Sequence, residues 1–110
     1  MGTGENNKEI AARLALTRRA LGYDRQTEFV EALNAVFSVS PARWNNYETG
    51  RERIAVPVAL ALCDRFDLSF GWIYRGKRGG LPARILRAIE DIEAVDQRLR
   101  KHAFGGVVVK

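Results

Sequence analysis

The sequence has few of the residues on which many folds and enzymes depend, with one cysteine, one histidine and three prolines in 110 residues. Cys63 alone cannot form an internal disulfide or a cysteine-based metal site, and we expect a buried small hydrophobic residue there. His102 has no partner for metal binding or acid–base chemistry nearby in the sequence. No run approaches the roughly 20 apolar residues needed to cross a bilayer, and Met1 to Lys8 lacks the apolar stretch of a signal peptide. These absences favour a cytoplasmic protein without a membrane partner.

Catalytic and cofactor-binding motifs are also missing from the sequence. There is no Ser-His-acid set, no cluster of metal ligands and no glycine loop of the kind that holds a phosphate. The segment GKRGG at residues 76–80 is rich in glycine, but no strand signal precedes it. We therefore expect no enzymatic activity, no cofactor, no metal ion and no small-molecule ligand.

Basic residues outnumber acidic ones by 18 to 13, which gives a formal net charge of +5. Such an excess favours a polyanionic partner, although net charge does not determine the fold. The length suits a single domain with one modest core, with room for a short additional element.

Helix signals follow one another along the chain, whereas strand signals are almost absent. Asn6 is placed to cap a first helix. Asp24 is placed to cap a second helix, whose apolar stripe continues to Phe37. A fourth helix is expected from Pro57 and a fifth, short one after Ser69. The sequence therefore predicts an all-α protein.

The clearest of these signals define a third helix, Pro41–Glu48. Ser40 is a good N-cap, and the proline that follows it suits the first helical position. Gly50 is placed to take the left-handed conformation that ends the helix. Trp44 and Tyr47 lie three residues apart and share an inward face. The other side chains have no obvious reason to be buried: Ala42, Arg43, Asn45 and Asn46. A small helix that exposes amide and guanidinium groups suits the major groove of DNA.

A final amphipathic helix is expected to begin at Pro82. One side of it carries a stripe of apolar residues: Ile85, Ile89, Ile92, Val95 and Leu99. This stripe is either the interface of a dimer or the face by which the helix folds back on its own bundle. The apolar tail at residues 105–110 is either a frayed end or an edge strand in a dimer.

The chain also contains an ordered set of residues that belongs to a known pattern. In sequence order these are Gly22 at a helix end, Gln26 opening the next helix, the apolar pair Phe29-Val30, the segment Trp44–Gly50 and Pro57. This order resembles the lambda-repressor-like, or xenobiotic-response-element-type, helix-turn-helix family, and the resemblance covers residues 10–82. It implies a bundle of five helices in which the third helix enters the major groove. The final amphipathic helix is additional to that bundle.

The resemblance implies roles for individual residues. Gln26 matches a glutamine that binds a DNA phosphate, and Arg51 and Arg53 lie in a loop that approaches the sugar-phosphate backbone. The base-reading positions of the family fall on five residues: Pro41, Ala42, Arg43, Asn45 and Asn46. Glu48 matches a glutamate with a structural role. Whether Arg43 contacts guanine or a phosphate stays open at this point.

The chain departs from the family pattern between Phe29 and Trp44, which are separated by about four extra residues, the length of one helical turn. Either the second helix is one turn longer or the connection after it is longer. Either change alters the angle at which the third helix is presented. Pro41 and Ala42 also replace polar residues that the family often has at the start of the reading helix.

These observations together predict a sequence-specific DNA-binding transcriptional regulator, a repressor that acts as a homodimer on double-stranded DNA. Residues 1–80 are expected to form the DNA-binding domain, and residues 81–110 a helix and tail for dimerisation. The alternative is a protein-interaction or antitoxin-type adaptor with the same helical fold. Such an adaptor need not keep the basic loop or the asparagine-bearing face, and their presence here favours DNA binding.

Overall fold

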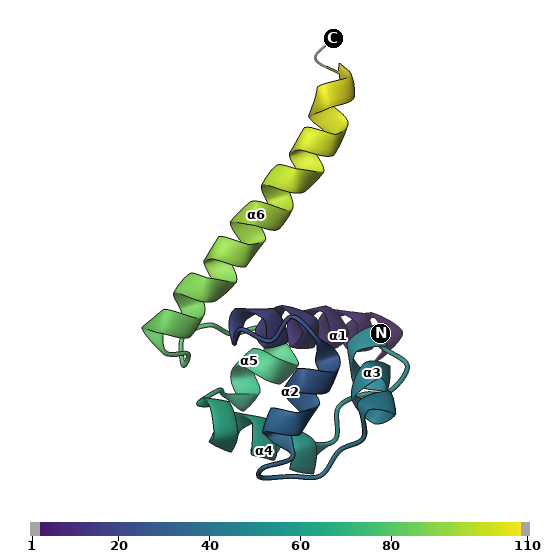
Figure 1. The fold of residues 1–110 in the computed structure, drawn as a ribbon, viewed down its shortest axis with the longest axis vertical. Coiled ribbons are helices and arrows are strands. Elements are labelled where there is room, and N and C mark those ends of the chain that lie inside the picture. The colour runs from purple at the N-terminus through teal and green to yellow at the C-terminus, as the bar shows by residue number, and fades with distance from the viewer. Residues whose placement is uncertain (1–2, 109–110) are drawn as a thin grey trace.

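Every regular element in residues 3–108 is an α-helix, which confirms the predicted all-α class. The structure is a computed structural model that describes the backbone of these residues and the side chains of residues 7–101. The helices in this part of the chain are α1 (Thr3–Ala20), α2 (Gln26–Leu33), α3 (Pro41–Thr49), α4 (Val56–Phe66), α5 (Phe70–Arg75) and α6 (Ala83–Val108). Helices α1 to α5 form a bundle, and α6 extends away from it as a long single helix (Figure 1).

A cluster of aromatic side chains lies in the core of the bundle. The ring of Phe29 in α2 is stacked on Phe66 in α4 with centroids 5.3 Å apart, and it lies 4.9 Å from the ring of Trp44 in α3. Trp44 in turn meets Tyr47 edge to face at 5.8 Å. Such pairs add stability beyond the area that they bury. The cluster therefore fixes α3 against α2 and α4.

The predicted start and stop signals of α3 are confirmed. The Ser40 hydroxyl accepts a hydrogen bond from the backbone N–H of Arg43 at 3.0 Å, and the proline after Ser40 occupies the first turn. Gly50 ends the helix with φ +82°. A Cβ atom on this glycine would lie 3.8 Å from the Cα atom of Lys8, an ordinary contact distance. The positive φ, and not a lack of space, is therefore what requires glycine here.

The two caps expected at the first helices do not occur. Helix α1 begins at Thr3, so Asn6 lies inside it and not at its start. Helix α2 has Arg25 at the N-cap position, so the prediction of Asp24 as the cap is wrong. The backbone carbonyl of Asp24 instead accepts a hydrogen bond from the Arg18 side chain at 2.6 Å. This contact holds the turn between α1 and α2 in place without a side-chain cap.

Residues 34–40 connect α2 to α3. Helix α2 ends before the predicted apolar stripe reaches Phe37. In the connection, the Asn34 side-chain oxygen accepts a hydrogen bond from the backbone N–H of Val39 at 2.9 Å. Val39 is 6% exposed and belongs to the core. A side chain of the connection therefore closes it, and buried Val39 anchors it just before α3.

Helices α4 and α5 follow the expected signals closely. Helix α4 begins one residue before Pro57 and ends at Phe66, and Asp67 caps its C-terminus in a left-handed conformation. The Ser69 hydroxyl caps α5 by accepting from the backbone N–H of Trp72 at 3.0 Å. The indole N–H of Trp72 donates to the buried Thr17 hydroxyl at 2.8 Å, which joins α5 to α1.

Helix α6 divides into a packed half and a distal half. Ile85 and Ile89 are 2% and 0% exposed and belong to the core of the bundle, whereas Ile92 is half-buried. Val95 and Leu99, which define the distal half, are 41% and 65% exposed. The first two residues of the predicted dimer interface therefore fold back on their own bundle, and only the last part of the stripe is open to a partner.

Two ion pairs also link α6 to the bundle. Arg78, before the helix, contacts Glu93 at 2.7 Å, and Arg19 of α1 contacts Asp96 at 3.1 Å. The hydrogen bonds from Arg19 lower the pKa of Asp96. Exposed ion pairs contribute little to stability, so the burial of the first isoleucines is what attaches α6.

The predicted apolar tail does not form a strand within the described residues. Residues 105–108 continue α6, and Val109 and Lys110 lie outside the part of the chain that the structure describes. The side chain of His102 is likewise outside the described residues. None of the helices in residues 3–108 combines the length and the apolar character that a membrane crossing requires.

Candidate nucleic-acid interface

Helix α3 is buried on one side and open on the other. Trp44 and Tyr47 are 0% and 1% exposed. The five residues matched to base-reading positions lie outside this buried side. Pro41, Ala42, Arg43 and Asn45 are exposed, and Asn46 is half-buried. The structure therefore leaves amide and guanidinium groups accessible on a helix that is fixed from within.

The fixed side of α3 carries a buried hydrogen-bond network around Glu48. The Glu48 carboxylate accepts from Nε of Arg18 at 2.7 Å, from Nη2 of Arg18 at 3.2 Å and from Nε2 of Gln26 at 2.9 Å. The indole N–H of Trp44 donates to the same carboxylate. A carboxylate has about four acceptor sites, so these donors satisfy it. We call these four residues the Glu48 network.

Arg18 extends the Glu48 network to the turn between α1 and α2. Its Nη1 atom donates to the backbone oxygens of Tyr23 and Asp24 at 2.9 and 2.6 Å. The side chains of Arg18 and Glu48 are only 10% and 4% exposed. The Arg18–Glu48 ion pair joins α1 to α3. The other hydrogen bonds of the network add the turn after α1 and helix α2, so together they set the orientation of α3 in the bundle.

Gln26 opens α2 and is half-buried. The resemblance assigns this residue to a DNA phosphate, yet the structure uses one of its two amide N–H groups for Glu48. The second N–H group of the same amide remains for a phosphate oxygen. A contact with DNA at this position would therefore be made by a side chain whose orientation Glu48 already fixes.

The loop after α3 carries two exposed basic residues, Arg51 and Arg53. The guanidinium carbon of Arg53 lies 5.8 Å from the centre of the Tyr74 ring. The Tyr74 hydroxyl donates to the backbone oxygen of Ile54 at 2.9 Å, and burial raises the pKa of this hydroxyl. Tyr74 therefore supports the loop from α5, and the two arginines lie on the open side of the chain near α3.

Glu52 lies between these arginines in sequence and binds Arg43. A single oxygen, Oε2, accepts from Nε and Nη2 of Arg43 at 3.2 and 3.0 Å. These hydrogen bonds raise the pKa of Arg43. Glu52 could not be predicted from the sequence, because a contact between a helix and the loop after it follows no helical spacing.

Metal-ligating side chains and the single cysteine do not form a further site in the described residues. No group of three or more histidine, cysteine, aspartate and glutamate side chains there could hold a metal ion. Cys63 is half-buried and not fully buried as predicted, and burial raises the pKa of its thiol.

Comparisons of the chain with protein-family models, with curated proteins and with solved structures gave no match. The geometry of α3, of the Glu48 network and of the loop after α3 therefore carries the functional argument.

Proposed function

We propose that the chain is a sequence-specific DNA-binding transcriptional regulator, a repressor built on a lambda-repressor-like helix-turn-helix. In this proposal α2 and α3 are the two helices of the motif, and α3 enters the major groove. The observation that carries the proposal is the two-sided character of α3. Its buried side is held by aromatic packing and by the Glu48 network, while Arg43 and Asn45 are exposed. A helix held in this way presents polar groups without having to reorganise.

The candidate residues divide into two kinds of contact. Asn45 and Asn46 carry amides, which can pair with N6 and N7 of adenine. Gln26, Arg51 and Arg53 would bind phosphates and fix the register of the protein on the duplex without reading sequence. The net charge of +5 supports a polyanionic partner. Affinity for DNA in general would come from the second group, and sequence preference from the first.

Replacing Asn45 with alanine is expected to relax the sequence preference at one base pair by about 1–3 kcal/mol, the contribution of one bidentate contact. Binding to random DNA should stay unchanged, because the substitution removes no charge. Titration of cognate and random duplexes with the variant measures both quantities. Gln97→Ala is the matched control, because it removes an exposed amide from α6. Equal losses on cognate and random DNA would count against a base contact by Asn45.

Replacing Arg53 with alanine is expected to reduce the salt dependence of binding. The slope of log K against log salt concentration should fall in magnitude by about 0.9, the value for one lost phosphate contact. Arg87→Ala removes the same charge from an exposed site on α6 and should leave the slope unchanged. An unchanged slope in Arg53→Ala itself would remove this residue from the phosphate contacts.

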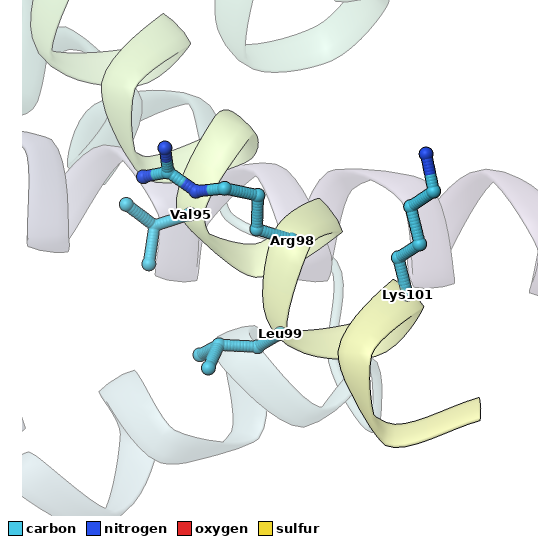
Figure 2. Close-up of a pocket in the computed structure, with 4 residues that line it drawn as sticks. All are labelled: Val95, Arg98, Leu99 and Lys101. Atoms are coloured by element: carbon cyan, nitrogen blue, oxygen red, sulfur yellow. The ribbon is translucent and has the colours of Figure 1, made fainter. Parts of the chain in front are cut away.

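A homodimer is part of the proposal, because two helix-turn-helix units can read two half-sites about 34 Å apart. The surface for it is the distal half of α6. Figure 2 shows Val95 and Leu99 projecting from the same side of the helix, where they line an open surface pocket with Arg98 and Lys101. We propose that a second copy of the chain covers this apolar strip.

The charges along α6 favour a second copy in antiparallel orientation. Glu90 and Asp91 are exposed acidic residues that precede the apolar strip, and exposed basic residues lie at its C-terminal end: Arg98, Arg100 and Lys101. Antiparallel pairing would bring the acidic segment of one helix beside the basic segment of the other. Parallel pairing would instead place like charges together, which destabilises an interface.

Selection from a random pool of DNA duplexes at physiological salt tests the proposed function. Enrichment of an inverted repeat, with its half-sites about one DNA turn apart, is the result that we expect. A pool that stays random after several rounds would overturn the proposal and favour the protein-interaction or antitoxin-type adaptor.

A further inference from the structure

Glu52 is an acidic residue on the surface that we propose to face DNA. Its side chain is 37% exposed and that of Arg43 is 54% exposed. A carboxylate near phosphates is unfavourable, since like charges repel. The presence of Glu52 beside Arg43, a candidate base-reading residue, therefore needs an explanation.

The geometry of the pair leaves one edge of the Arg43 guanidinium open. An arginine has five N–H donors in a rigid fork. Glu52 takes the N–H of Nε and one N–H of Nη2, which form the side edge of the fork. Glu52 does not engage the other edge, which is made by Nη1 and by the second N–H of Nη2. These two donors are parallel, and they match the O6 and N7 acceptors of guanine.

The net charge of the Arg43–Glu52 pair favours guanine over phosphate as the target of Arg43. Glu52 neutralises the guanidinium, so the pair as a unit has little attraction for a phosphate. The guanine acceptors are uncharged, and recognition of their edge depends on the orientation of the fork more than on its charge. Glu52 supplies that orientation, because it holds two of the three guanidinium nitrogens.

We propose that Glu52 is a positioning residue, which holds the Arg43 guanidinium for bidentate recognition of a guanine in the major groove. This inference rests on the proposed function and deepens it by naming the base that Arg43 reads. Arg51 and Arg53, on either side of Glu52 in the sequence, have no such carboxylate among their hydrogen-bond partners in the described residues, and they remain free to bind phosphates.

The test uses the DNA duplex selected by the full chain and compares its affinity with duplexes in which each guanine is replaced in turn. Wild-type protein should lose roughly 5- to 150-fold in affinity at one G·C pair, as one bidentate contact implies. The double variant Arg43→Ala/Glu52→Gln removes the pair as a neutral unit. It should lose this discrimination and keep the wild-type salt slope.

The single variant Glu52→Gln gives a second, independent readout. It frees the charge of Arg43, so binding to random DNA should tighten and the salt slope should steepen by up to about 0.9. Preference for the guanine should fall at the same time. Glu31→Gln, which removes an exposed charge from α2, should leave the guanine preference unchanged.

The outcomes separate the two proposals. A wild-type chain that selects no sequence overturns the proposed function. A chain that selects an operator but keeps its guanine preference in the double variant or in Glu52→Gln overturns only the role of Glu52 and Arg43. Both side chains are partly exposed, so thermal unfolding of each variant should match that of the wild type.

Discussion

Replacing Glu48 with alanine is expected to lower the free energy of unfolding by about 3–5 kcal/mol, the cost of breaking a buried ion pair by removing one partner. The substitution leaves the Arg18 guanidinium buried without its carboxylate. It also removes the acceptor of the Trp44 indole and of the Gln26 amide. Since single domains are stable by only about 5–15 kcal/mol, the effect should be visible directly in urea denaturation.

Two further variants keep this prediction testable if Glu48→Ala does not fold. Glu48→Gln retains one carbonyl acceptor and should give a smaller loss. The double variant Arg18→Met/Glu48→Gln removes both charges and should be more stable than Glu48→Ala, because no buried charge is left unpaired. Glu31→Ala is the control, and an exposed site of this kind should change stability by no more than about 0.5 kcal/mol. A loss in Glu48→Ala as small as that of the control would contradict the central place of the Glu48 network.

Replacing Ile89 with alanine is expected to lower the free energy of unfolding by about 2–5 kcal/mol, because a large buried side chain is removed from the core. Leu99→Ala should change the stability of the monomer by no more than about 0.5 kcal/mol, since Leu99 is 65% exposed. Denaturation at protein concentrations where the chain is monomeric measures both. Equal losses at the two positions would mean that the distal half of α6 also packs on its own bundle.

Leu99 should matter for assembly and not for the stability of the monomer. Leu99→Lys is expected to produce monomers without loss of monomer stability, because it places a charge in the proposed interface between two copies. Sedimentation at increasing concentration is the measurement. Dimers that persist in Leu99→Lys and in Val95→Lys would place the interface elsewhere on the molecule.

The features that the sequence could predict are those decided by neighbouring residues. Ser40 and Ser69 cap their helices as expected, and Gly50 ends α3, because capping depends on side chains and backbone groups within one helical turn. The failed cap at Asp24 shows the limit of such reasoning. A residue six positions away, Arg18, binds the backbone carbonyl of that turn and holds it without a cap.

Longer-range features could not be predicted from the same signals. Arg18 and Glu48 are 30 residues apart, and no periodicity connects them. The apolar stripe of α6 is regular along its length, but periodicity shows only which face is apolar and not what covers it. Ile89 is covered by the bundle, and Leu99 is not. The connection before α3 likewise depends on one side chain, Asn34, which binds the backbone N–H of Val39. The sequence does not show whether α2 ends at this residue or continues past it.

The base-reading role of α3 is the part of the proposal that depends on DNA itself. Its five candidate positions lie outside the buried side of the helix, and sequence and structure agree that Trp44 and Tyr47 fix the other side. Arg43 is the residue for which the structure adds most, because its contact with Glu52 is the basis on which we propose guanine as its target, a choice that the sequence left open.

The central claim is that the exposed side of α3 lies in the major groove. Binding of the full chain to its selected duplex, with each adenine and guanine replaced by the 7-deaza analogue, tests it directly. This replacement removes the N7 acceptor from the major groove and leaves the minor groove and the phosphates intact. Affinity should fall about fivefold or more at the contacted purines of each half-site. Unchanged affinity for every substituted duplex would contradict the claim.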